Sequence, residues 1–205
     1  MIVMAQQVQP QAAPKPPQLK MTKLMDEIFD YPLPEGYGIR NIDGSAEDIA
    51  AWVRICRNGV LPAGVDEKSA YDSRITNWKG RQDICPEKDV FMVYEAETGE
   101  VVATITGFVM ADGDGDIHMV AADPACRGKK IGHAMLSHAL KKLKADGVPR
   151  VHLTTDDWRR PAIKNYLAAG FRPVWFEGVA ERWEVIFREM DMEPVPFLYE
   201  GELSV

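Results

Sequence analysis

The sequence contains few cysteines and no long apolar run. Its 205 residues include three cysteines, Cys56, Cys85 and Cys126, and none of them forms a CxxC pair. A sparse, odd set of this kind indicates reduced thiols in a cytoplasmic protein rather than a disulfide framework. No segment approaches the roughly 18 apolar residues of a membrane helix, and the first five residues are too short for the apolar region of a signal peptide. We therefore expect a cytoplasmic protein with no membrane partner.

The chain also lacks an excess of positive charge. It has 24 Lys and Arg against 31 Asp and Glu, a formal net charge of −7. A general nucleic-acid binder needs a basic face for phosphates, so nucleic acid is disfavoured as a partner. A local basic loop can still bind phosphates on an acidic protein. The composition, 46% hydrophobic and 27% charged, is typical of one soluble globular domain with or without an appendage.

Three regions follow one another along the chain. Residues 5–17 are rich in Gln, Ala and Pro and have neither a helical nor a strand period, so residues 1–35 are expected to form an extended or partly disordered arm. Within this arm we expect a short amphipathic piece at 24–29, before Pro32 and Pro34. Residues 36–192 form the expected domain, and residues 193–205 form a tail that supplies a candidate edge strand.

Within the domain, short strands alternate with helices. Ser45 and Asp48 have the capping-box spacing at the start of one helix. The clearest helix covers 132–145, where Leu136, Ala139, Leu140 and Leu143 repeat at helical spacing. Strands are expected at 37–42, 89–95, 100–110, 116–122, 150–155 and 171–176, and further helices at 66–80, 161–170 and 183–190. This order predicts an α/β (α+β) domain with a mixed sheet.

Residues 116–136 carry the most informative pattern. A strand runs into Pro124, a turn brings Arg127, Lys129 and Lys130 together, and Gly132 opens a helix. The first backbone N–H groups of a helix lack internal partners, and the helix dipole adds positive charge there. The pattern therefore favours an anion site, although a solvated surface turn is the alternative. No GxxxxGK[ST] and no GxGxxG after a strand is present, which excludes the other common phosphate loops.

This turn resembles the acetyl-CoA loop of GNAT N-acetyltransferases, which is written R/Q-x-x-G-x-G/A. Arg127 and Gly132 match that loop, and Lys130 replaces its inner glycine. A second segment resembles the family's A-x-x-x-Y-x-x-x-G-F, with Ala162, Tyr166, Gly170 and Phe171 in register; Arg159 stands where the family often has Asn. The resemblance covers roughly 37–176. It implies a mixed, mostly antiparallel sheet with splayed central strands, flanked by helices.

The resemblance also implies acetyl-CoA as cosubstrate and a role for each matching position. The strand end at 120–122 would pair with the pantetheine amides, and the amides of 127–132 would hold the pyrophosphate. Tyr166 would protonate the leaving thiolate, since a phenol with a reference pKa near 10 stays protonated at neutral pH. Trp158 with Arg159 and Arg160 would replace the missing Asn by binding cofactor phosphate or substrate carboxylate; the alternative is a solvated helix start. The expected cofactor-binding residues are Val120, Ala121, Ala122, Arg127, Gly128, Lys129, Lys130, Ile131, Gly132, His133 and Arg159.

The sequence leaves three alternatives for the base that would take a proton from the attacking amine. The strand period of two predicts that Asp116, His118, Val120 and Ala122 share one face. Asp116 resembles in position the catalytic glutamate of histone-acetylating relatives, and His118 has a reference pKa near neutrality. Alternatively both residues are structural and the amine arrives neutral. The Asp-rich turn at 112–116 lacks the bidentate Glu of a calcium loop, so no metal is expected.

The sequence therefore predicts an N-acetyltransferase that transfers an acetyl group from acetyl-CoA to a primary amine, on a small molecule or a peptide. The acidic surface mildly favours a cationic acceptor. A non-catalytic CoA-binding sensor or interaction module is the first alternative, and an α/β domain without CoA affinity is the second. Homodimerisation stays open.

Overall fold

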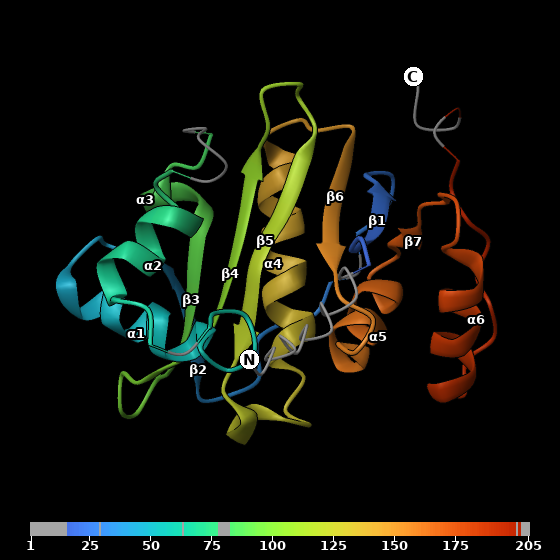
Figure 1. The fold of residues 1–205 in the computed structure, drawn as a ribbon. Coiled ribbons are helices and arrows are strands. Elements are labelled where there is room, and N and C mark those ends of the chain that lie inside the picture. The colour runs from blue at the N-terminus through green and yellow to red at the C-terminus, as the bar shows by residue number, and fades with distance from the viewer. Residues whose placement is uncertain (1–15, 29, 63, 78–82, 200, 202–205) are drawn as a thin grey trace, which may run out of the picture.

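A computed structural model describes residues 16–28, 30–62, 64–77, 83–199 and 201. Its central feature is a seven-stranded sheet in the order β2-β3-β4-β5-β6-β1-β7 (Figure 1). Among these strands β5 and β6 run parallel, and the other neighbouring pairs are antiparallel. The mixed, mostly antiparallel sheet is thus confirmed. The strands are β1 (Leu19–Leu24), β2 (Tyr37–Asn41), β3 (Val90–Glu95), β4 (Val101–Val109), β5 (Gly115–Ala122), β6 (Arg150–Thr155) and β7 (Arg172–Pro173).

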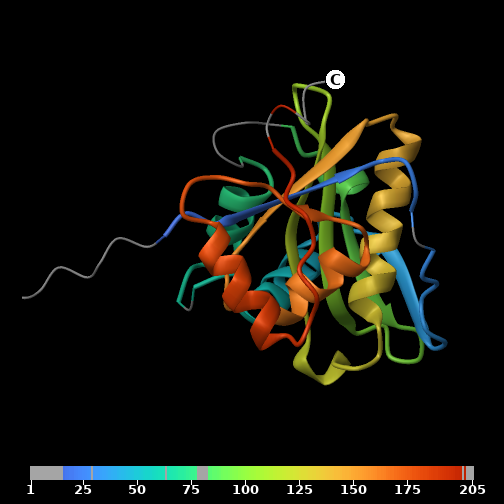
Figure 2. The same ribbon diagram turned by 90° about the vertical axis from the view of Figure 1, so that its right-hand side faces the viewer.

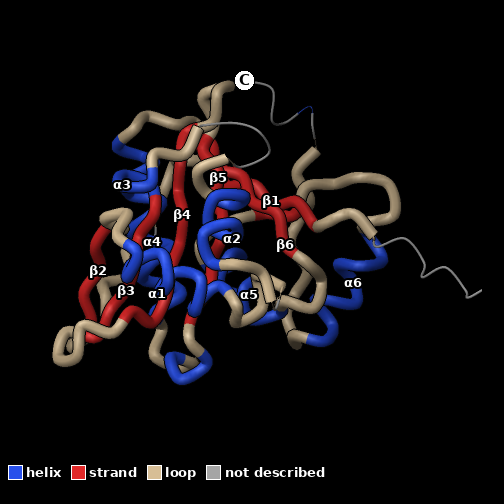
Figure 3. Tube along the Cα trace, turned by 60° about the vertical axis from the view of Figure 1, so that its left-hand side comes forward, coloured by secondary structure: helices blue, strands red, loops and turns tan. Residues whose placement is uncertain are grey.

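Helices cover both faces of the sheet, so that it has a hydrophobic core on each side. Figure 1 shows α4 behind the central strands, and Figure 3, from another side, shows α2 in front of them. One core contains the buried residues of α4, α5 and α6, and the other contains those of α1 and α2. The helices are α1 (Ala46–Cys56), α2 (Glu67–Arg74), α3 (Pro86–Asp89), α4 (Ile131–Ala145), α5 (Arg160–Ala168) and α6 (Ala180–Glu189), with a short 3₁₀ helix, η2, at Pro124–Cys126.

Helix α4 forms where its apolar stripe predicts it. Leu136, Ala139, Leu140 and Leu143 are each at most 1% exposed, because their spacing places them on one side of the helix. The helix ends before Gly147, whose φ of +81° is a backbone conformation that glycine adopts without strain. This helix packs against β4 and β5, and its N-terminus adjoins the basic turn.

The N-terminal region differs from its prediction. Residues Leu19–Leu24 are not part of an arm outside the domain but form β1, which pairs with β6 and β7. The N-terminal strand therefore lies between elements from the C-terminal half of the chain (Figure 2). Leu19 and Met21 are fully buried there. The expected amphipathic piece at 24–29 is absent from the described residues up to 28, since β1 ends at Leu24 and no helix follows; residues 1–15 and 29 lie outside the described part.

Two other predictions hold only in part. The strand expected at 171–176 is reduced to β7, and Val174 forms a single parallel bridge with Leu198. The C-terminal tail therefore contributes one bridge rather than a strand, as far as the structure describes it. Helix α2 ends at Arg74, and residues 78–82 of the region beyond it are outside the described residues.

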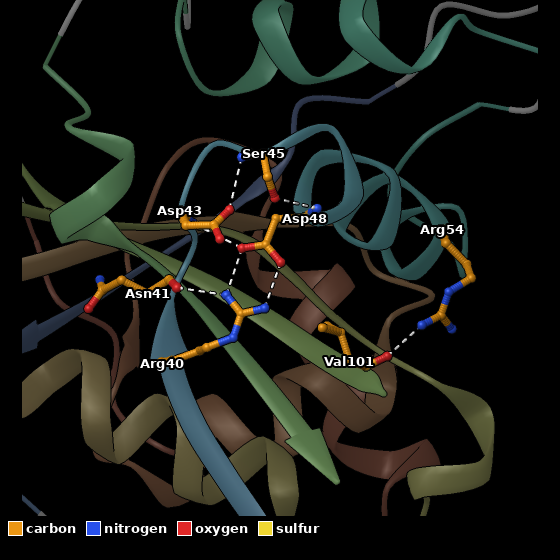
Figure 4. A network of polar contacts seen from close by, with 7 residues as sticks. All are labelled: Arg40, Asn41, Asp43, Ser45, Asp48, Arg54 and Val101. Atoms are coloured by element: carbon orange, nitrogen blue, oxygen red, sulfur yellow. Dashed lines mark hydrogen bonds and ion pairs between the residues drawn. The ribbon is translucent and has the colours of Figure 1, made fainter. Parts of the chain in front are cut away.

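An ion pair fixes the start of α1 against β2 (Figure 4). Ser45 caps the helix by accepting a hydrogen bond from the Asp48 amide at 3.2 Å. The Asp48 carboxylate does not complete a capping box; it accepts two bonds of 2.6 Å from Arg40 and one of 2.9 Å from the Asp43 amide. The Arg40 bonds, ahead of burial in the opposite direction, hold the pKa of Asp48 below its ordinary value.

No helix in the described part of the chain is both long enough and apolar enough to cross a membrane.

Candidate active site

The basic turn before α4 leaves several backbone amides without partners. The amides of Arg127 and Lys129 bond to the carbonyls of Pro124 and Cys126. Among the described residues, no hydrogen bond is formed by the amides of Gly128, Lys130, Ile131 and Gly132. Such amides at a helix start, together with the helix dipole, suit an oxygen-rich anion.

Lys130 adopts the conformation that the family's inner glycine would favour. It is the N-cap of α4 with φ +60° and ψ 12°, in the left-handed region. Gly128, with φ +79°, is left-handed as well. A non-glycine residue in this region costs roughly 1–2 kcal/mol. The lysine therefore keeps the shape of the turn at a cost in stability, and adds a cation to it.

Close packing, rather than its backbone angles, favours glycine at position 132. A β-carbon at this position would lie 2.5 Å from Asn165 Nδ2, closer than real carbon contacts allow. The start of α4 therefore lies directly against α5. A side chain at Gly132 would force the two helices, or Asn165, to move beside the unpaired amides.

The segment before β2 borders the turn, a feature that the sequence did not reveal. Lys129 Nζ donates a 2.8 Å hydrogen bond to the Tyr37 hydroxyl, which raises the pKa of Lys129. The Tyr31 ring lies 5.1 Å from the His133 ring. Burial, with Lys130 nearby, lowers the pKa of His133, so His133 offers a neutral ring at pH 7. A cavity of about 390 Å³ is lined by Tyr31, Pro32, Leu33, Pro34, Gly128, Lys129 and Lys130.

A β-bulge interrupts the pairing of β4 with β5. Thr104 lies opposite Ala121 and Thr106 opposite His118, so the single residue between them in β4 faces two residues of β5. Met119, one of those two, has φ +49°, as the extra residue of a bulge can.

Pairing between β5 and β6 ends at Ile117 with Leu153. Beyond this point the two parallel strands separate, which opens the sheet next to the basic turn.

The bulge overturns the prediction that four residues of β5 share one face. Ile117 is buried in the core under α4, whereas Met119 and Ala121 are buried in the core under α1 and α2. Val120 and Ala122 pack against the α4 core. Asp116 and His118 therefore face the α1–α2 side, because the extra residue shifts the period of two by one.

Only part of the strand end offers backbone groups to the opening. The Asp123 amide bonds to the Val102 carbonyl at 2.7 Å. By the alternation of an antiparallel ladder, Ala121 then bonds toward β4, and Ala122 turns its N–H and C=O toward the β6 side. The Val120 carbonyl accepts a 2.9 Å bond from Arg159 Nη2. Of the three residues expected to pair with pantetheine, Ala122 has its groups directed to the opening, while the Val120 carbonyl already has a donor.

Tyr166 lies on α5 in the core beneath α4. It is 4% exposed, and its ring packs edge-on against Phe171 at 6.0 Å. Burial raises the pKa of Tyr166 to about 12, against a lowering by Arg159. No described residue forms a hydrogen bond with its hydroxyl. Tyr166 is therefore a protonated phenol at neutral pH, and its O–H group donates no hydrogen bond to any described residue.

The two candidate bases lie on the other side of the sheet. His118 Nε2 is 3.0 Å from the Arg74 carbonyl at the end of α2, so this nitrogen carries the proton and donates it. Asp116 lies where β5 pairs with Phe108 and His152. The structure does not bring either residue to the core that contains Tyr166. Within the described residues, no group of three or more His, Cys, Asp and Glu side chains could hold a metal ion.

The region from α1 to Phe171 matches a known family. The family model described as the acetyltransferase (GNAT) family matches residues 46–171. The chain belongs to this family. The matched residues include the basic turn, the bulged strand β5 and α5 with Tyr166. Acetyl-CoA is the cosubstrate of GNAT enzymes.

Relatives of known name and solved structures agree with the GNAT assignment. A mycothiol acetyltransferase of Thermomonospora curvata is 30% identical over 150 residues, which are 70% of this chain and 48% of the relative. The chain thus spans about half the length of such relatives. A GCN5-related N-acetyltransferase from Sphaerobacter thermophilus has a similar fold, with a TM-score of 0.61 at 23% identity over 77% of this chain and 49% of the other. A Mycobacterium tuberculosis protein in complex with CoA has a TM-score of 0.50 at 20% identity, and the match covers 74% of this chain and 81% of the other.

Proposed function

We propose that this chain is an acetyl-CoA-dependent N-acetyltransferase that transfers the acetyl group to a primary amine by direct attack. The observation that carries the proposal is the opening between β5 and β6 beside a turn in which four amides have no partner among the described residues. A diphosphate fits the turn. The rest of an extended coenzyme fits the opening, where Ala122 presents one N–H and one C=O.

The chain's residues divide the reaction between the two faces of the sheet. In the proposed reaction Tyr166, on the α4–α5 side, donates a hydrogen bond to the sulfur as it leaves. The acceptor amine would approach from the α1–α2 side, where Asp116 and His118 lie. The amine nitrogen attacks the thioester carbonyl through the opening, and preorganised backbone donors stabilise the oxygen that becomes negative. This division explains why Tyr166, the proposed acid, is not in contact with Asp116 or His118, the candidate bases.

Acetyl-CoA is expected to raise the thermal stability of the protein. A ligand at 100 times its Kd stabilises the folded state by about 2.7 kcal/mol, which for a chain of this size is an increase in Tm of roughly 5–10 °C. Thermal unfolding with acetyl-CoA, and with dephospho-CoA and acetate as controls, measures it. An unchanged Tm at millimolar acetyl-CoA would favour an α/β domain without CoA affinity.

Thiol release from acetyl-CoA over an amine panel separates the enzyme from a non-catalytic CoA-binding module. The alternative of a non-catalytic module is supported by the Val120 carbonyl, because this carbonyl already accepts a hydrogen bond from Arg159. The panel begins with amines related to mycothiol, because the curated relatives are named mycothiol acetyltransferases. It continues with glucosamine and a lysine peptide. Calorimetric binding of acetyl-CoA without turnover on any amine would select the module.

The base is tested by pH–rate profiles of Asp116→Asn and His118→Ala. If one of them takes the proton from the amine, its removal shifts the acidic limb of kcat/KM and lowers the rate by about 10²-fold. His118→Ala also removes the bond to the Arg74 carbonyl, so its thermal stability is measured alongside. If both variants keep the wild-type acidic limb, the amine arrives neutral and neither residue is the base.

A further inference from the structure

Arg159 is a half-buried cation without a carboxylate partner among the described residues. The arginines near it are paired: Arg160 Nε lies 3.0 Å from Glu189, and Arg182 Nε lies 2.9 Å from Asp157. Arg159 makes one bond, to the Val120 carbonyl, and lies 5.8 Å from the Trp158 ring. A guanidinium removed from bulk water is costly unless an anion accompanies it. No described residue bonds to its other four N–H donors, which are therefore available to a ligand.

The position of Arg159 identifies which part of the coenzyme it faces. Its anchor, Val120, lies just past the bulge where β5 and β6 separate. Arg159 is the N-cap of α5, seven residues before Tyr166, and this spacing returns to the same side of a helix. Arg159 is also the charged group that acts on the buried Tyr166 phenol. The guanidinium thus lies at the opening, close enough to act on the phenol that the proposed function places at the sulfur, and also on the buried Cys56 thiol of α1.

Tyr166 is a weak acid for a departing thiolate. Burial raises its pKa to about 12, whereas an ordinary thiol has a pKa of about 8.5. Full proton transfer from the phenol to the sulfur is therefore unfavourable, because the phenol holds its proton more tightly than a thiol does. The phenol can donate a hydrogen bond, and a cation beside the sulfur would stabilise its negative charge further.

We propose that Arg159 holds the negative charge that develops on the coenzyme sulfur as the acyl–sulfur bond breaks, an inference that rests on the proposed acetyl transfer. The amine nitrogen forms a bond to the carbonyl carbon, and the C–S electron pair leaves with the sulfur. The guanidinium donates to that thiolate while its bond to Val120 keeps it in place. The proton lost by the nitrogen passes to solvent or to a base, and the products are the amide and CoA as thiolate or thiol.

The thiol of bound CoA provides a test that needs no acceptor. Protein saturated with CoA is titrated by the ultraviolet absorbance of the thiolate, with the complex of desulfo-CoA subtracted to remove the protein's own cysteines. We expect the pKa of the bound thiol to lie about one to three units below that of free CoA. Arg159→Gln should return it to the value of free CoA. Arg159→Lys should keep part of the shift, since it retains the charge but loses the planar donor array.

Arg160→Gln is the matched control, because it removes a neighbouring arginine that pairs with Glu189, and it should leave the bound thiol unchanged. A wild-type complex whose thiol titrates like free CoA would overturn the inference, while calorimetric binding of CoA would leave the proposed function standing. Failure of CoA to bind at all would remove both. If Arg159→Gln does not fold, the wild-type titration and Arg159→Lys decide the matter.

Discussion

Tyr166→Phe is expected to lower kcat by about 10²-fold or more, with little change in the Kd of acetyl-CoA. The variant loses the O–H group that would donate to the leaving sulfur, and one preorganised donor of this kind contributes roughly 10²–10³ in kcat. The ring stays, and with it the packing against Phe171. Because no described residue bonds to the hydroxyl, its loss leaves no protein group without a partner. Steady-state thiol release and calorimetric binding measure the two quantities.

Tyr71→Phe is the control for this prediction. Tyr71 is 3% exposed and lies in the core under α1 and α2, and its hydroxyl has no hydrogen-bond partner in the part of the chain that the structure describes. It is thus a buried tyrosine away from the α4–α5 face, and its variant should keep wild-type kcat. Equal turnover of Tyr166→Phe and the wild type would reject Tyr166 as the acid and leave it as a core residue.

Asp48→Ala is expected to lower the free energy of unfolding by about 3 kcal/mol at pH 7. The change removes an acceptor of three hydrogen bonds and leaves the Arg40 guanidinium without its carboxylate. The Asp48 side chain is 7% exposed, whereas that of Arg40 is 41% exposed. Arg40 can therefore be rehydrated in part, which keeps the cost at the low end for a buried pair. Urea unfolding followed by circular dichroism measures it.

The pH dependence of this difference has a definite sign. Because the Arg40 bonds lower the pKa of Asp48, its contribution is fully present above the ordinary carboxyl pKa near 4 and is lost as the pH falls through the lower folded value. The gap between wild type and Asp48→Ala should therefore narrow below about pH 4. Asp43→Ala is the control, since Asp43 is exposed and its carboxylate accepts one bond, from the Ser45 amide. A gap that is constant with pH would argue against the ion pair as the cause.

Signals confined to a few neighbouring residues predicted much of the fold. The stripe of α4, the Ser45 cap of α1 and the neighbouring strands β3 and β4 appear where the sequence placed them. The basic turn was predictable as well, because the amides of a helix start lack partners wherever the helix lies. The motifs at Arg127, Gly132, Tyr166 and Gly170 gave the family, which the match over residues 46–171 confirms.

Contacts between distant segments decided the rest. Leu19–Leu24 forms a strand because it pairs with β6 on one side and β7 on the other. No local pattern next to the Pro- and Gln-rich segment predicts this pairing. The bulge at Met119 moved Val120 and Ala122 to the face opposite His118, and it depends on the register with β4. A hydrophobic period or a helix cap acts within one or two turns of chain, so the sequence determines it by itself. Strand order, bulges and the partner of a charge such as Arg159 depend on which remote backbone lies alongside, and only the tertiary structure fixes that.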